Sequence, residues 1–143
     1  PFLSPDAGVN SGMMIAHYTQ AAMAMEAQRL ALPAATQSLP TSAMQEDHVS
    51  NGWAAARALR RSVAALRRVL AVELVCAAAA IDLRSLPPAA GTGAAVKVLR
   101  QRVAGPGPDR WLSPDLRAAE QLLADGSVLT AVEAAIGELE VLR

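Results

Sequence analysis

Apolar residues dominate two long stretches of the chain, and in both the pattern predicts an α-helix. Between residues 12 and 30, methionine and alanine leave no broad polar face. Between residues 42 and 83, leucine and valine recur three or four residues apart, opposite an arginine-bearing face that disappears beyond Leu70. A helix that is apolar nearly all round must be surrounded by other helices. We therefore expect both helices to pack against protein surfaces larger than a small monomer provides.

Helix start and stop signals divide the rest of the chain. Ser42 and Gln45 fit a capping box, which predicts that the second long helix begins at residue 42. Asn10 or Ser11 is the expected cap of the first long helix. Prolines and glycines then separate three shorter predicted helices, at about 92–103, from Ser113 to Gly126, and from residue 127 onward. No alternating pattern predicts a strand. The fold expected is all-α, with a long-helix core segment at 1–85 and a C-terminal helical subdomain at 86–143.

Composition narrows the class of protein further. Hydrophobic residues make up 52% of the 143 residues but aromatic residues only 3%, which suits closely packed helices and argues against a β-sandwich or barrel. Thirteen basic and thirteen acidic residues cancel, so a nucleic-acid or anionic-membrane partner is not expected. No clean apolar stretch reaches the roughly 20 residues of a membrane span. The single cysteine, Cys76, allows no internal disulfide, which favours a reducing compartment and hence the cytoplasm.

Candidate chemistry is concentrated at residues 45–48, where Gln45, Glu46, Asp47 and His48 follow one another. Two interpretations stay open: acids in the first turn of a capped helix, which are common, or a group of side chains for proton transfer or hydrogen bonding. A metal site is not expected, because His17 and His48 lack further ligands at suitable spacing. The residues alone thus indicate a helical segment that functions at an interface.

Several blocks of sequence carry a specific resemblance. Residues 1–3 (PFL), 8–16 (GVNSGMMIA) and 39–50 (LPTSAMQEDHVS) resemble, in order and spacing, the C-terminal part of the family of histidine ammonia-lyases and their aromatic amino acid lyase and aminomutase relatives. Residues 69–74, 81–84, 109–111 and 113–115 are similar to later landmarks of the same family. The resemblance covers nearly the whole chain and fades after about residue 129.

This resemblance implies a long-helix bundle assembled as a homotetramer, with active sites where subunits meet. The family eliminates ammonia from an amino-acid substrate with an electrophile, 4-methylideneimidazol-5-one (MIO), made from an Ala-Ser-Gly triad. No such triad occurs in this chain. The expectation is therefore a C-terminal piece of a longer lyase, inactive alone, whose partner is the remainder of the parent polypeptide. Tyr18, the only tyrosine, is not expected to be the catalytic base.

The resemblance also assigns roles to individual residues. Glu46 matches the glutamate that faces the substrate in the histidine enzymes, and is the predicted catalytic residue. Gln45 is predicted to bind substrate beside it, and Asp47, His48 and Asn10 to support the site. The pairing of Glu46 with His48 favours conversion of L-histidine to urocanate.

One departure from the family pattern keeps other functions open. Met44 stands where the family usually has asparagine. The alternatives are a tyrosine or phenylalanine ammonia-lyase or aminomutase, and a non-catalytic helical assembly module.

Overall fold

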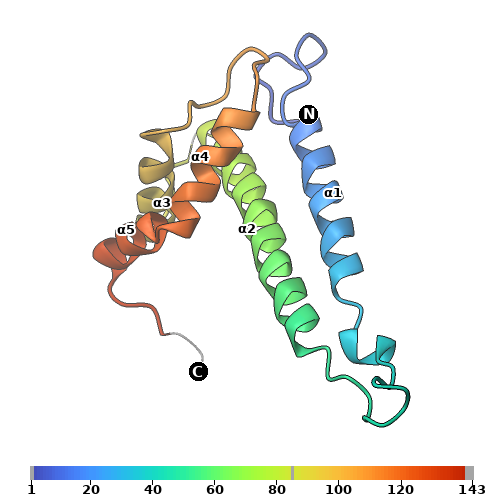
Figure 1. The fold of residues 1–143 in the computed structure, drawn as a ribbon. Helices are drawn as coiled ribbons and strands as arrows, with labels where there is room; N and C mark the ends of the chain where they lie inside the picture. Colours follow the sequence, from blue (N-terminus) through green and yellow to red (C-terminus); the bar gives the residue numbers. More distant parts are fainter. Residues whose placement is uncertain (1, 85, 141–143) are drawn as a thin grey trace.

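The computed structural model describes residues 2–84 and 86–140, and in these residues it is built from helices (Figure 1). Two long helices, α1 (Met14–Leu30) and α2 (Gly52–Asp82), run side by side as a hairpin, joined by a loop that contains the short 3₁₀ helix η1 (Ala34–Gln37). Three shorter helices gather beside the C-terminal half of α2: α3 (Ala90–Arg100), α4 (Ser113–Ala124) and α5 (Ser127–Ile136). The described residues contain isolated β-bridges and no strand. The all-α prediction is confirmed.

The core lies where the C-terminal half of α2 meets α4 and the end of α3. Leu99, Val75 and Val103 are its largest fully buried side chains. Ala71, Ala78 and Ala119 are buried among them, and such small side chains let neighbouring helices approach closely. The part of α2 that the sequence predicted to enter a core is therefore the part that does so. The predicted boundary between the two segments falls at residue 85, which lies outside the described residues. Helix α4, from the second segment, packs directly on α2, from the first.

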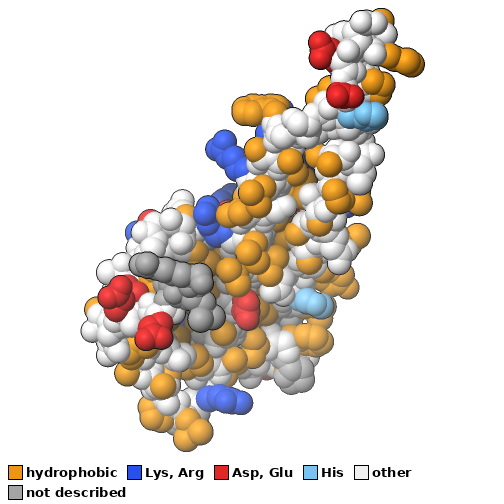
Figure 2. Space-filling model, turned by 90° about the horizontal axis from the view of Figure 1, so that it is seen from below, with side chains coloured by type: hydrophobic (Ala, Val, Ile, Leu, Met, Phe, Trp, Pro, Cys, Tyr) orange, Lys and Arg blue, Asp and Glu red, His pale blue; other side chains and the backbone are white. Residues whose placement is uncertain are grey.

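The rest of the hairpin exposes apolar side chains. Ala16 is the only buried residue of α1, while Tyr18 and Met25 are 68% and 66% exposed. On α2, Trp53 is 78% and Leu59 66% exposed. Figure 2 shows apolar side chains along the part of the hairpin that projects from the rest of the molecule, which we call the projecting arm. Contiguous apolar surface of this kind is uncommon on monomeric proteins. No helix among the described residues has the length and apolar character needed to cross a bilayer.

The predicted start of α2 is wrong. The helix begins at Gly52, after Asn51 in the left-handed conformation (φ +52°), and no side chain caps it. Ser42, the predicted cap, has φ +54° and belongs to a turn. The capping-box signal is local, and contacts that fold the preceding loop back on itself override it.

The predicted cap of α1 is also wrong, because the helix begins at Met14, after Met13, and no side chain caps it. Asn10 and Ser11 instead take part in a contact with the C-terminal half of the chain. The Asp109 carboxylate accepts hydrogen bonds from the backbone amides of Ser11 (2.7 Å) and Gly12 (2.9 Å). In return, the Asp109 amide donates to Asn10 Oδ1 at 3.0 Å. Arg110, the residue after Asp109, forms an ion pair with Asp115 in α4 at 2.8 Å. We call this set of bonds between Asn10–Gly12 and Asp109 the clasp.

We expect Asp109→Asn to lower the melting temperature of the chain at pH 7. The two backbone amides hold the pKa of the Asp109 carboxyl below its usual value, so the ionised form stabilises the fold. A lowered pKa contributes stability above about pH 4, and that contribution is lost as the pH falls through the folded-state value. The difference from wild type should therefore shrink in thermal melts below pH 4.

Asp6→Asn is the control, since the Asp6 side chain has no hydrogen bond or ion pair within the described residues. Equal shifts for the two variants, or a shift at Asp109 that does not depend on pH, would contradict this role for the clasp.

Candidate active-site loop

Four of the five candidate site residues, Gln45, Glu46, Asp47 and His48, lie in the loop that joins η1 to α2 at the tip of the hairpin. The Ser38 hydroxyl donates to the carbonyl of Val49, whose amide donates to the Leu39 carbonyl at 3.2 Å. Asn51 Nδ2 donates to the Ala34 carbonyl at 3.1 Å. These bonds close the neck of the loop, so residues 40–48 project as one unit, which we call the tip loop.

Backbone conformation at the top of the tip loop is unusual. Ser42, Ala43 and Met44 have φ values of +54°, +52° and +67°. The Gln45 amide donates to the Ser42 carbonyl at 3.0 Å, and the Glu46 amide to the Thr41 carbonyl at 3.3 Å. Non-glycine residues in the left-handed region cost about 1–2 kcal/mol each, and such strain clusters at functional sites. The tip loop is thus held in a conformation that its sequence alone does not favour.

The tip loop brings four of the predicted site residues together and exposes them. Gln45, Glu46, Asp47 and His48 are all exposed, and Figure 2 shows acidic side chains and a histidine side chain near the end of the projecting arm. Within the described ranges, the Glu46 carboxylate has no ion pair. The described residues therefore do not enclose the Glu46 carboxylate.

Asn10, the fifth predicted site residue, is not brought to Glu46 within one chain. It precedes α1, whereas Glu46 follows the other end of that helix (Figure 1). Seventeen helical residues separate the two ends, a length of about 25 Å at 1.5 Å per residue. The Asn10 side chain is instead held by the clasp.

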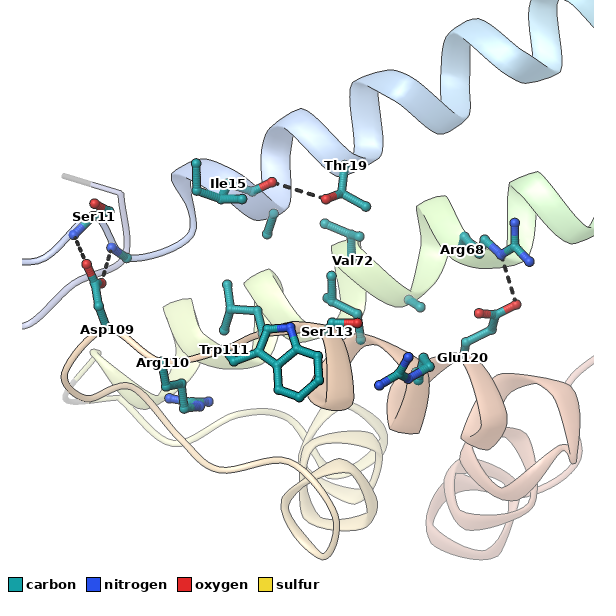
Figure 3. Close-up of a pocket in the computed structure, with 16 residues that line it drawn as sticks. Ser11, Ile15, Thr19, Arg68, Val72, Asp109, Arg110, Trp111, Ser113 and Glu120 are labelled. Carbon is teal, nitrogen blue, oxygen red and sulfur yellow. Dashed lines mark hydrogen bonds and ion pairs between the residues drawn. The ribbon is translucent and has the colours of Figure 1, made fainter.

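The structure also contains a pocket that the sequence did not predict, at the clasp end of the hairpin (Figure 3). It has a volume of about 630 Å³ and lies between α1, α2 and α4. Its lining includes Gly12, Ala16, Ala71, Val72 and Trp111. Nothing local in the sequence indicated that these helices would lie around one space.

We expect Met44→Asn to stabilise the chain, by a few tenths to about 1 kcal/mol. Asparagine tolerates the left-handed conformation better than methionine, and the Met44 side chain is 82% exposed, so its removal breaks no buried contact. The measurement is the urea midpoint of unfolding.

The matched control is Met25→Asn in α1, where methionine is 66% exposed but helical, and asparagine is the poorer helix former. This variant should be destabilised by about 0.5 kcal/mol. A lower midpoint for Met44→Asn would show that the methionine has a role other than filling the turn.

Fold and site together define a class of protein: an all-helical segment that projects a polar, acid-bearing loop from two long helices with exposed apolar side chains. The family model described as aromatic amino acid lyase matches residues 1–101. The chain belongs to the aromatic amino acid lyase family.

Individual relatives agree with this assignment. The chain is 55% identical over 97% of its length to the histidine ammonia-lyase of Streptomyces avermitilis, and spans 28% of that relative. Among solved structures, it is similar to histidine ammonia-lyase from Trypanosoma cruzi, with a TM-score of 0.88, 36% identity, and coverage of 94% of this chain and 27% of that one. Tyrosine aminomutase from Streptomyces globisporus gives a TM-score of 0.87 at 32% identity, over 99% of this chain and 27% of that one.

Proposed function

We propose that this chain is the C-terminal part of an ammonia-lyase that converts L-histidine to urocanate and ammonia. The observation that carries the proposal is the Glu46 carboxylate, exposed on a strained and internally bonded loop, in a chain 55% identical to a histidine ammonia-lyase. The chain spans about a quarter of such relatives, so its function is that of a component.

In this proposal Glu46 binds the imidazole of the amino-acid substrate. An imidazole N–H donates a hydrogen bond to a carboxylate, and charge-assisted bonds are roughly twice as strong as neutral ones. The carboxylate can also accept and return a proton. Gln45 supplies an amide beside it for a further substrate contact. Asp47 and His48 lie next in the same loop, where they shape the approach to the carboxylate.

The electrophile must come from elsewhere in the full-length protein, by which we mean the longer polypeptide that contains this chain. The chain has no Ala-Ser-Gly triad, so its own residues do not fit formation of MIO. That group supplies the electrophilic activation for loss of ammonia, and we assign it to the remainder of the polypeptide. For the isolated chain we propose no lyase activity.

The exposed faces of the hairpin support a proposal about assembly. Tyr18, Met25, Trp53 and Leu59 are each about two-thirds exposed or more, from both helices. A homotetramer of the full-length protein would cover these faces and place each tip loop among neighbouring subunits. The balanced charge favours neither a nucleic-acid nor a membrane partner, and the single free Cys76 suits the cytoplasm.

A second candidate function is action on tyrosine or phenylalanine, either as a lyase or as an aminomutase. The likeness to the Streptomyces globisporus tyrosine aminomutase, at 32% identity over 99% of this chain, favours keeping it. A third is a helical assembly module without catalysis.

The deciding experiment offers the purified full-length protein L-histidine, L-tyrosine and L-phenylalanine in turn, and follows the ultraviolet absorbance of the conjugated product. We expect absorbance to rise with histidine. A rise with tyrosine alone would replace the first candidate by the second, and no product from any of the three would favour the assembly module. The isolated chain, assayed for ammonia release, should give none.

A further inference from the structure

The tip loop exposes a methionine side chain beside the proposed catalytic carboxylate. Met44 is 82% exposed and lies two residues before Glu46. Of the other four methionines in the sequence, one is 66% exposed and three are half-buried: Met25, and then Met13, Met14 and Met23. Met44 therefore has the most accessible thioether of the five.

Met44 is also a central residue of the turn that places Glu46. The Gln45 amide donates to the Ser42 carbonyl at 3.0 Å and closes the turn around Met44, while the Glu46 amide donates to the Thr41 carbonyl at 3.3 Å. Met44 itself has φ +67°. Because a non-glycine residue in the left-handed region is strained, the turn depends on these two bonds to keep its shape.

Methionine is a costly residue for this turn. Its side chain is mostly exposed and its backbone is strained, so neither burial nor local conformation favours methionine at position 44. A residue that breaks a local rule in this way is expected at functional sites. What methionine brings to the loop is a thioether, which is polarisable and can be oxidised.

A hydroperoxide oxidises a thioether without any further reagent. With hydrogen peroxide, the O–O bond breaks, one oxygen atom becomes bonded to Sδ, and its proton passes to the other oxygen, which leaves as water. The sulfur loses two electrons to become a sulfoxide, and the peroxide gains them. Methionine sulfoxide reductases reverse the change with two thiols, which form a disulfide while the sulfoxide oxygen leaves as water.

A sulfoxide at Met44 would introduce a hydrogen-bond acceptor next to the two bonds that hold the turn. Oxidation makes the apolar side chain polar. The new oxygen would compete with the carbonyls of Ser42 and Thr41 for the amides of Gln45 and Glu46, which are the next two residues along the chain. Loss of either bond lets the strained turn relax and moves the Glu46 carboxylate. A displacement of about 1 Å can reduce a catalytic rate 100-fold.

We propose that Met44 is an oxidation site that controls the tip loop: a hydroperoxide converts its thioether to the sulfoxide, the turn loosens, and turnover falls until a methionine sulfoxide reductase restores the thioether. The proposal rests on the proposed function in one respect, that Glu46 acts in catalysis. It adds the chemistry by which the position of Glu46 is regulated.

The test treats the purified full-length protein with hydrogen peroxide and then with dithiothreitol, which reduces disulfides but leaves methionine sulfoxide in place. Met44→Leu removes the sulfur with little change in volume, and Met25→Leu, at the other exposed methionine, is the matched control. Mass spectrometry of peptides gives the rate of sulfoxide formation at each methionine and the hydrogen exchange of the tip-loop amides. Histidine turnover is compared with that of the same protein before treatment.

We expect sulfoxide to form at Met44 at least fivefold faster than at the half-buried Met23. Turnover should fall about tenfold in the wild-type protein and in Met25→Leu, but less than twofold in Met44→Leu. Reductases for both sulfoxide epimers should restore it. An equal loss in Met44→Leu, or oxidation of Met44 no faster than that of Met23, would overturn the proposal.

Hydrogen exchange separates this proposal from the proposed function, because it needs no substrate. Faster exchange in the tip loop after oxidation of Met44, in a protein that never acts on histidine, would exclude the substrate assignment alone. Histidine turnover that is unchanged once Met44 is fully oxidised would exclude the oxidation site alone.

Discussion

Glu46→Gln in the full-length protein is expected to reduce turnover of histidine by about 100-fold or more, because general acid–base groups typically contribute 10²–10⁴-fold. Glutamine keeps the shape of the side chain and one oxygen acceptor but loses the charge, and with it both the charge-assisted bond to the imidazole and the ability to take up a proton. The measurement is kcat from the absorbance of urocanate.

The melting temperature of the same variant should change little, because Glu46 is exposed and substitutions of exposed residues away from special contacts have small effects. Asp47→Asn is the control, since it removes the same charge from the next position of the tip loop and should change turnover only a few-fold. Equal losses at the two positions, or a loss that follows a fall in melting temperature, would return Glu46 to a structural role.

Leu99→Ala is expected to destabilise the 143-residue chain by about 2–5 kcal/mol, the range found when a fully buried leucine is cut back to alanine. Leu99 is 0% exposed and lies among Val75, Val103 and Leu122, so its removal leaves a cavity between α2, α3 and α4. Because whole domains are stable by only about 5–15 kcal/mol, this is a large part of the total. Urea unfolding followed by circular dichroism measures the change.

Two further leucine variants make the result specific to the core. Leu86→Ala removes a leucine that is 75% exposed and should cost no more than about 0.5 kcal/mol. Leu99→Met nearly conserves volume and should cost less than about 1.5 kcal/mol. If Leu99→Ala and Leu86→Ala unfold at the same urea concentration, the core lies elsewhere.

The shorter helices were predictable because their ends carry local signals. Pro114 lies in the first turn of α4, where its missing N–H costs nothing, and Gly126, with φ +76°, separates α4 from α5. The start of α2 was not predictable in this way. Ser42 and Gln45 satisfy a local rule, but the bonds that decide the matter join Ser38 to Val49 and Ala34 to Asn51 across the neck of the loop.

The candidate site shows the same division between local and distant information. The sequence located Glu46 and its neighbours through a specific block of residues, and the structure places them on one exposed loop. It could not show that Asn10 and Asp109 meet, because these two residues are 99 positions apart and no periodic pattern connects them. The pocket between α1, α2 and α4 was missed for the same reason, since three helices and a loop contribute to it.

The clasp has a consequence for the order of folding. Its partners are separated by 97 to 99 residues, whereas the connection between α1 and α2 runs only from residue 31 to residue 51. The entropy lost on closing a loop grows with its length, so we expect the contacts across the hairpin to form before the clasp. During synthesis on the ribosome, residues 10–12 emerge long before residue 109, so the clasp cannot form until Asp109 has also emerged. The segment leading into α1 therefore settles late, after the hairpin has formed.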